Sequence, residues 1–486
     1  MPLFVFIMVA ITIAGVSVLF LVRNTVPTGW CVLYLGLPLA AALGAVALWP
    51  QQGFRSLRFA LFLFAAAMVL KGLMAVWIQT PPESDFALLY QAAEALARGE
   101  NSLNTTPYFQ RWPYQSAFVA VLAFCIRRFG AGPAFFAWCN VTLSALTNVL
   151  AYRLARRFAS ERGAQVAAMA FLLYPGTFFL VPVLSNQHLS EFLLLAALVV
   201  YTGPVPSPTR RLWSAVVAGL LLALSNAVRP MAAVVVLAAL ALAVLQTVNW
   251  QADRQGSLLW NVLLPCLGFV GAYFLCFRGL DAWTRLSGLN RLGLGNEVPE
   301  WKFVLGLNEA SGGRYSAADA ATVFGSGAAD HQAARALIKE RLSIPLPRLM
   351  NLMAHKIYLM WGGFEDTSWA LTDRAIQLLN DRGIGEMVEQ GAEWLCRLAS
   401  GCYLAITLSV AWGALPRLRA PKKSAANGAY TVVLLTALAY FAAHLLIEIQ
   451  VRYRSTMTLL LILLTAPGVD ALSQRWARQK ASERKM

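Results

Sequence analysis

The feature that most constrains the fold is a series of apolar stretches, most of them about as long as a helix needs to cross a bilayer. A spanning helix needs about 20 apolar residues. Only 13% of the 486 residues are charged and 58% are hydrophobic, whereas soluble domains are roughly 25% charged. The sequence therefore predicts an all-α polytopic membrane protein with about twelve transmembrane helices. The predicted spans lie near 3–22, 30–49, 57–78, 134–153, 164–183, 190–203, 212–228, 231–248, 258–277, 394–415, 428–448 and 455–471.

Other classes of protein fit the composition poorly. Disorder requires low hydrophobicity, which this chain does not have. The net charge is +16, but the basic residues form short clusters between apolar spans, so nucleic acid is not a predicted partner. The seven cysteines lie mostly in or beside apolar runs without a C-x-x-C pair, and we interpret them as reduced packing residues. The four histidines lack metal-ligand spacing, so no zinc site is predicted.

The distribution of basic residues predicts the orientation. With a cytoplasmic N-terminus, the inner loops and tail hold the basic clusters at 55–58, 153–162, 210–211, 417–423 and 475–485, together with Arg254. This arrangement satisfies the positive-inside rule, whereas its inverse does not. The first span is expected to be an anchor and not a removable signal peptide. Membrane lipids are predicted partners, and the inner clusters suit contact with anionic lipids.

The same arrangement of spans divides the chain into three parts. Residues 1–278 form a transmembrane region with an outer loop at 80–133, residues 279–393 form a mainly helical outer cap, and residues 394–486 form the last helices and a basic tail. Segment 113–130 is short and basic at one end. If it crossed the bilayer, the 153–162 cluster would face outward, so it is expected to lie on the outer surface as an amphipathic helix.

The first outer loop contains the most informative stretch, Pro81-Pro82-Glu83-Ser84-Asp85. The two prolines stop the third span, and a helix follows that ends near Gly99. Asp85 would lie in the first turn, where the helix dipole favours an ionised carboxylate. The stretch thus predicts an anionic base at the outer membrane surface. Ser84 or Asp85 is expected to cap this helix, and the alternative is that Asp85 is only a cap.

Further polar residues lie at the outer ends of spans. His188 and Glu191 lie where one predicted span is connected to the next, and Arg229 interrupts an apolar run. Ionisable groups near membrane depth are functional candidates because lipid exposure is unfavourable, although interfacial anchoring is the alternative. Three residues spaced four apart are expected to share one helical stripe, namely His444, Glu448 and Arg452.

Taken in order, these motifs resemble those of the GT-C superfamily of membrane glycosyltransferases. The first outer loop has the Glu83-x-Asp85 pair, then Tyr90 and Ala93, and a glycine that ends the helix. The stretch from Tyr108 to Tyr114 is similar to juxtamembrane helices of that superfamily, 189–194 looks like a second outer loop, and 448–454 resembles the start of the last span. The chain departs by having two spans ahead of the one that leads into the signature loop, and 279–393 offers no match.

The resemblance implies a GT-C-like fold and transfer of a monosaccharide from a polyprenyl-phosphate carrier to an envelope glycan, lipid or protein, with inversion at the anomeric carbon. It also implies an active site on the extracytoplasmic side of a bacterial plasma membrane. Asp85 would be the general base, with Glu83 and Glu191 as further catalytic candidates, and Arg452 and Arg229 would bind the donor phosphate. Substrate-binding candidates are Tyr90, Trp112, Tyr114, His188, His444 and Glu448. Candidate surfaces for stacking on sugar are Trp112, Tyr114 and Trp361, with an aromatic belt as the alternative. Glu83 and Asp85 could also hold a divalent cation, and metal dependence stays open.

Two alternatives also use lipid-linked sugars. A flippase or transporter would place ionisable residues in a mid-bilayer cavity and have little outer mass. A polysaccharide polymerase or ligase would act on longer lipid-linked glycans. The outer position of the ionisable residues and the outer segment of over a hundred residues favour an enzyme, and the Glu83-x-Asp85 loop favours a monosaccharide donor.

Overall fold

The computed structural model describes residues 2–24, 29–50, 53–250, 257–325, 330–419 and 428–483. Within these ranges the fold is all helical, as predicted, with no residue in a strand. Of the predicted inner clusters, Arg254, Lys422, Lys423, Arg484 and Lys485 lie outside the described residues.

In the described part of the chain, nine helices are long and apolar enough to cross a membrane, and the protein is an integral membrane protein. They are α1 (Pro2–Asn24), α2 (Gly29–Leu48), α3 (Ser56–Trp77), α7 (Pro133–Ala155), α11 (Pro208–Val228), η2 with α13 (Leu259–Leu286), α19 (Gly385–Arg419), α21 (Gly428–Leu446) and the run Val451–Gln479. That last run contains η4 (Val451–Arg454) and α22 (Ser455–Leu463) and reaches into α23 (Ala466–Glu483). Two shorter apolar helices, α10 (Gln187–Tyr201) and α12 (Ala232–Trp250), match two more predicted spans.

The span predicted at 164–183 is wrong as a single helix. Helix α8 (Glu161–Leu173) stops at Tyr174, and only the short α9 (Gly176–Phe179) follows. Pro175 explains the break, because the residue before a proline is pushed out of helical geometry. Tyr174 accordingly has extended backbone angles, φ −66° and ψ 121°. The chain beyond it is free to form irregular structure between the helices.

The first outer loop folds into short helices that are not membrane spans. These are α4 (Ser84–Ala97), α5 (Pro107–Arg111), η1 (Pro113–Gln115) and α6 (Ser116–Phe129). With 14 residues, α6 is too short to cross a bilayer. It packs against α4 around buried Leu89, Ala93 and Leu122. It ends at Gly130, whose φ of 62° favours glycine.

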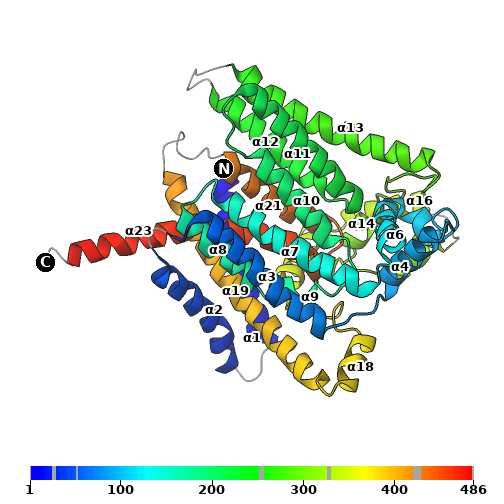
Figure 1. The fold of residues 1–486 in the computed structure, drawn as a ribbon, viewed down its shortest axis with the longest axis horizontal. Coiled ribbons are helices and arrows are strands. Elements are labelled where there is room, and N and C mark those ends of the chain that lie inside the picture. Colours follow the sequence, from blue (N-terminus) through cyan, green and yellow to red (C-terminus); the bar gives the residue numbers. More distant parts are fainter. Residues whose placement is uncertain are drawn as a thin grey trace.

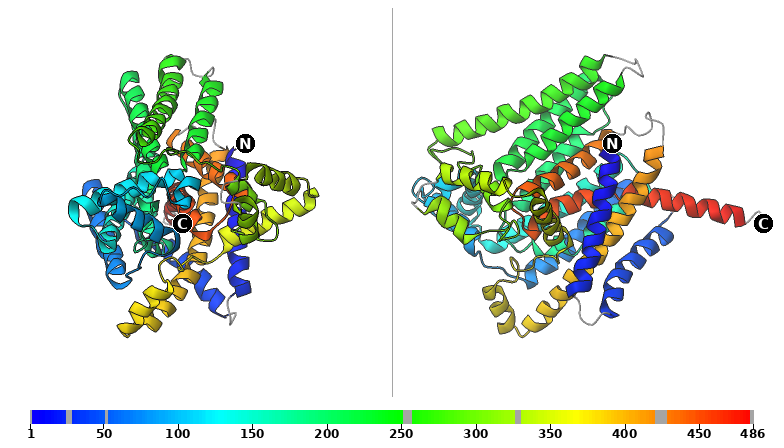
Figure 2. Two further views of the ribbon diagram at one scale, coloured as in Figure 1. Left: turned by 90° about the vertical axis from the view of Figure 1, so that its right-hand side faces the viewer. Right: turned by 180° about the vertical axis from the view of Figure 1, so that it is seen from behind.

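The predicted outer cap is mainly helical. It contains α14 (Trp301–Gly306), α15 (Ala317–Phe324), α16 (His331–Leu342), α17 (Leu346–Ile357), η3 (Tyr358–Gly362) and α18 (Asp373–Asp381). Because α13 continues to Leu286 and α19 starts at Gly385, two long helices take up both edges of the predicted 279–393 segment. Helices α4, α6, α14 and α16 gather at one end of the bundle, and α23 projects from the opposite end (Figures 1 and 2).

Lys356 on α17 joins the cap to the bundle. Its side chain is only 1% exposed. Its ammonium donates to the carbonyl oxygens of Gly306 at 2.8 Å, Leu445 at 2.7 Å and Ile447 at 2.9 Å. One lysine therefore ties α14 and the end of α21 to α17.

Replacing Lys356 with Met is expected to lower the free energy of unfolding by about 1–3 kcal/mol, because buried carbonyl oxygens lose their donor. Thermal unfolding of the detergent-purified protein measures the change. Lys339→Met on α16 is the matched control, because Lys339 is exposed. Equal midpoints for the two variants would contradict the role of Lys356.

Candidate active site

The backbone before Asp85 has an unusual conformation. The N-cap of α4 is Glu83, and no side chain forms a capping bond there, so the prediction that Ser84 or Asp85 caps the helix is wrong. Ser84 has φ 51° and is the one non-glycine residue with positive φ among those described. Such strained residues cluster at functional sites. Within the described ranges, the Asp85 carboxylate accepts no hydrogen bond and forms no ion pair, so it is free to act on a ligand.

The charges that act on Asp85 come from segments far away in the sequence. The surrounding protein displaces water and raises the pKa of the Asp85 carboxyl above the usual 3.8. The cations Arg452 and Lys302 oppose this rise, whereas the carboxylate Glu448 adds to it. Asp85 is therefore a carboxyl with a raised pKa in a field of two cations and one anion.

Lys302 on α14 is a site residue that the sequence analysis missed. Its ammonium forms an ion pair with Glu448, and the backbone N–H of Glu448 donates to the Lys302 carbonyl at 2.8 Å. It also lies 5.7 Å from the centroid of the Tyr453 ring. Desolvation alone would lower the pKa of Lys302, but Tyr453 and Glu448 raise it above its usual range. Lys302 is thus a fixed cation.

The predicted stripe of His444, Glu448 and Arg452 does not exist as one helix. Helix α21 ends at Leu446, and Arg452 lies in η4. Between them, Glu448 and Ile449 donate backbone hydrogen bonds to the cap, which replaces the helical hydrogen bonds that the spacing assumed. His444 stays on α21, is buried, and its Nδ1 pairs with the Tyr440 carbonyl at 2.9 Å.

The Nε atom of Arg452 is held by a hydrogen bond, whereas the two terminal nitrogens of its guanidinium are available. Its Nε donates to Gln450 Oε1 at 2.7 Å. Its guanidinium carbon lies 3.9 Å from the centroid of the Trp369 ring and 5.5 Å from that of Phe86. The two terminal nitrogens have no acceptor among the described residues, which suits binding of an external anion.

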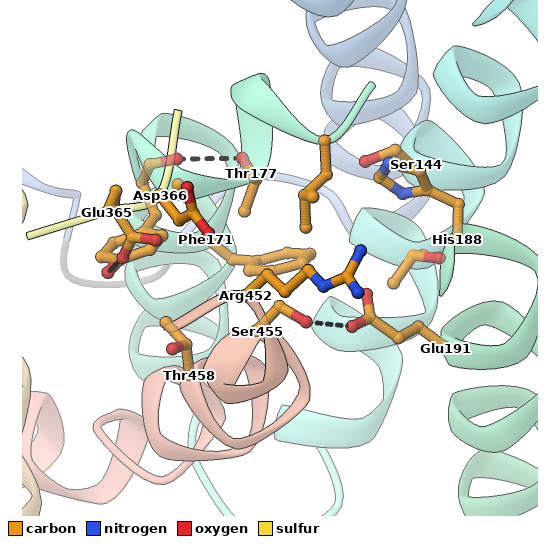
Figure 3. Close-up of a pocket in the computed structure, with 14 residues that line it drawn as sticks. Ser144, Phe171, Thr177, His188, Glu191, Glu365, Asp366, Arg452, Ser455 and Thr458 are labelled. Atoms are coloured by element: carbon orange, nitrogen blue, oxygen red, sulfur yellow. Dashed lines mark hydrogen bonds between the residues drawn. The ribbon is translucent and has the colours of Figure 1, made fainter. Parts of the chain in front are cut away.

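Arg452 also lines a pocket between the spans (Figure 3). The empty space, counted with that at its mouth, is about 600 Å³. Glu365 and Asp366 lie on one side of it in Figure 3, and His188 and Glu191 lie on the other, with Arg452 between them in this view. The pocket is lined by Ser144, Thr147, Phe171, Tyr174, Gly176, Thr177, Leu180, His188, Glu191, Glu365, Asp366, Arg452, Ser455 and Thr458.

The two predicted residues on α10, His188 and Glu191, differ in how fully their polar atoms are hydrogen-bonded. Glu191 accepts hydrogen bonds from Ser455 at 2.5 Å, Thr456 at 3.0 Å and Gln187 at 3.2 Å. His188 is 6% exposed, and its Nε2 has no hydrogen-bond partner in the described structure. Glu191 is therefore tied to the last spans, whereas His188 offers an unused ring nitrogen at the pocket wall.

Lys71 on α3 is a second residue that the sequence analysis missed. It is 0% exposed, and its ammonium donates to Ser144 at 2.6 Å beside the pocket. An ionisable residue inside an apolar span was the signal that could have identified it. Glu365 and Asp366 were also missed, because they follow no motif and come from the cap.

The remaining predicted residues are spread around this site. Arg229 donates to Asn186 at 3.2 Å and lies 5.5 Å from the Tyr453 ring centroid. Tyr114 lies among the same charges, and burial raises the pKa of its hydroxyl. Tyr90 packs on the ring of Phe136, at 6.4 Å between centroids.

Of the two tryptophans predicted to stack on sugar, Trp112 is half-buried and Trp361 is buried. Trp112 lies 5.9 Å from the ring of Phe324 in the cap. Trp361 is 1% exposed and packs on Phe441, at 5.5 Å between centroids. Because Trp361 offers no free face to a ligand, the prediction that it stacks on sugar is wrong.

Glu83 and Asp85 supply only part of a cation site. In the described part of the chain, no group of three or more His, Cys, Asp or Glu side chains could hold an ion. Glu83 and Asp85 supply two carboxylates, and one oxygen of Glu83 is buried without a hydrogen bond. Divalent cations prefer six or more oxygen ligands, so these two side chains fill only part of a coordination shell.

Comparisons with known proteins give structural matches only. No protein-family model matches the sequence, and no curated protein matches it significantly. An apo oligosaccharyltransferase from Archaeoglobus fulgidus is 15% identical with a TM-score of 0.45, over 87% of this chain and 52% of that chain. ArnT from Cupriavidus metallidurans, bound to undecaprenyl phosphate, is 14% identical with a TM-score of 0.36, over 87% and 78%.

The chain spans about half the length of the oligosaccharyltransferase.

Proposed function

We propose that the protein is a membrane glycosyltransferase that moves a monosaccharide from a polyprenyl-phosphate carrier to a hydroxyl of an envelope glycan, lipid or protein. One observation carries the proposal. The unpaired carboxylate of Asp85 lies in the field of two cations, Arg452 and Lys302, and Arg452 also lines a pocket between the spans.

The reaction needs what this site supplies. The acceptor oxygen forms a bond to the anomeric carbon, while the bond from that carbon to the phosphate oxygen breaks. The acceptor proton passes to Asp85, and the electron pair leaves with polyprenyl phosphate. Because phosphate is a good leaving group, it needs cations and no proton donor, and Arg452 provides charge-assisted hydrogen bonds. Attack opposite to the leaving group inverts the anomeric centre.

A flippase or transporter of lipid-linked glycans is the second candidate. It is favoured by the buried Lys71, His188 and Glu191, which lie between spans as a translocation path would require. Against it, Asp85 and Lys302 lie on short helices of the outer loop and cap. A polysaccharide polymerase would share the site but use a longer donor.

The test is carried out in proteoliposomes with a panel of labelled polyprenyl-phosphate monosaccharides and crude envelope lipid as acceptor. The proposal predicts labelled product together with released polyprenyl phosphate. A flippase would instead move the labelled lipid between leaflets without releasing polyprenyl phosphate. Transfer from lipid-linked oligosaccharides alone would favour a polymerase.

Arg452→Gln is expected to lower kcat/KM for the donor about 10- to 100-fold, since a hydrogen bond to a charged group contributes roughly 1.5–3 kcal/mol. Steady-state transfer kinetics at varied donor concentration measure the change. Arg374→Gln, an exposed site on α18, is the matched control. Unchanged kinetics for Arg452→Gln would remove this arginine from the donor site.

A further inference from the structure

A second pocket lies at the opposite ends of the helices that build the active site. Helix α10 begins beside the active site at Gln187 and ends at this pocket with Tyr201. Helix α11 starts near the pocket, with Arg211 in the lining, and ends next to Arg229. The empty space, counted with its mouth, is about 1150 Å³. It is therefore separate from the proposed catalytic pocket and nearly twice as large.

Three arginines give this pocket a positive lining. Arg156 and Arg157 follow α7, and Arg211 comes from α11. Thr202, Gln246 and Asn261 add polar groups, and no aspartate or glutamate is among the described lining residues. Such a set of donors without a carboxylate suits an anion, above all a phosphate.

Arg156 and Arg211 have different partners in the described structure. Arg156 pairs with Glu161 at 2.7 Å, just outside the lining. Arg211 donates to the backbone carbonyl of Asn261 at 3.2 Å, and no carboxylate of the described residues is paired with it. Burial lowers the pKa of Arg157 below its usual range, and the neighbouring charges of Arg156 and Arg153 lower it further. Three positive charges thus lie close together at this pocket, and a bound anion would offset them.

The surroundings place the pocket at the level of a membrane surface. Its walls include Val262 and Pro265, on a helical run long and apolar enough to cross a bilayer, and Leu242, on the shorter apolar helix α12. Trp213 and Trp260, next to the lining in sequence, are 62% and 47% exposed. Exposed tryptophans at helix ends mark the interface between lipid and water. A basic pocket between spans at that depth suits an anionic lipid headgroup.

We infer that this pocket binds the phosphate headgroup of an anionic phospholipid at the face of the membrane opposite to Asp85. The acyl chains lie along the apolar walls, and the three guanidiniums contact the phosphate. The inference does not depend on the proposed transferase reaction, because it concerns binding alone.

The test is binding of acyl-labelled dansyl phosphatidylglycerol to the full chain in neutral detergent, read by energy transfer from tryptophan. Dansyl phosphatidylcholine, which is zwitterionic, is the lipid control and is expected to bind more weakly. Arg211→Gln is expected to weaken phosphatidylglycerol binding about fivefold, which corresponds to ~1 kcal/mol per basic residue. Arg211 is exposed, so the variant is expected to fold.

Arg210→Gln is the matched control, since Arg210 is exposed, adjacent and outside the lining. Retained affinity in this variant supports a specific pocket, whereas an equal loss would show diffuse surface attraction and overturn the inference. Inorganic phosphate at matched ionic strength is the competitor. Failure to displace the lipid supports a lipid site, and displacement would assign the pocket to free phosphate instead.

Discussion

Replacing Asp85 with Asn is expected to reduce sugar transfer by ~10²- to 10⁴-fold, the usual contribution of a general base. Asparagine keeps the size of the side chain but cannot accept the acceptor's proton. Because the Asp85 carboxylate has no partner among the described residues, the free energy of unfolding should change by less than about 0.5 kcal/mol. Transfer kinetics and thermal unfolding together separate loss of chemistry from loss of fold.

The matched control is Asp381→Asn, an exposed carboxylate at the end of α18. It should leave transfer and folding unchanged. Transfer that survives in a folded Asp85→Asn protein would reject Asp85 as the base. The search would then turn to Asp366, which lines the pocket, because Glu191 and Glu448 are already held by protein donors.

The same carboxyl should set the acid limb of the pH profile. A base must be deprotonated, so transfer rises with pH through the pKa of Asp85, which lies above 3.8. Removing the positive charge of Arg452 would raise that pKa further, since Arg452 opposes the rise. In Arg452→Gln the acid limb should therefore move to higher pH. An acid limb that stays at the same pH would show that the two groups do not interact.

Local sequence signals predicted the framework of the fold well. Runs of apolar residues located the spans, and Pro81-Pro82 correctly ended α3 before the signature loop. The predictions failed where a local signal was overlooked or where tertiary contacts outweighed the local preference of the chain. Pro175 broke the span predicted at 164–183, and backbone bonds to the cap replaced the helix expected through Glu448.

The site was only partly predictable for a related reason. Asp85, His188, Glu191 and Arg452 come from segments with recognisable patterns. Lys302 reaches the site from the cap, 146 residues away from its partner Glu448, and nothing in its own neighbourhood indicates that pairing. Glu365 could not be predicted either, because its role depends on its pairing with a buried arginine at the start of the last span.

That arginine, Arg454, is among the most buried charged groups of the described chain, with 1% exposure. It donates to Glu365 at 2.7 Å, to the Gly363 carbonyl at 2.7 Å and to the Met360 carbonyl at 3.1 Å. Tyr174 also donates to Glu365. The Arg454–Glu365 pair therefore holds the cap segment that places Glu365 and Asp366 at the pocket wall.

Glu365→Gln is expected to lower the free energy of unfolding by about 3–5 kcal/mol, because it leaves the Arg454 charge buried without its anion. Unfolding in mixed micelles of rising denaturing detergent measures the change. Glu309→Gln is the matched control, since its pair with Arg348 is exposed and should contribute less than ~1 kcal/mol. Adding Arg454→Met to Glu365→Gln removes the stranded charge and should restore part of the stability. A double variant no more stable than Glu365→Gln alone would show that packing around Glu365, and not the buried charge, accounts for the loss.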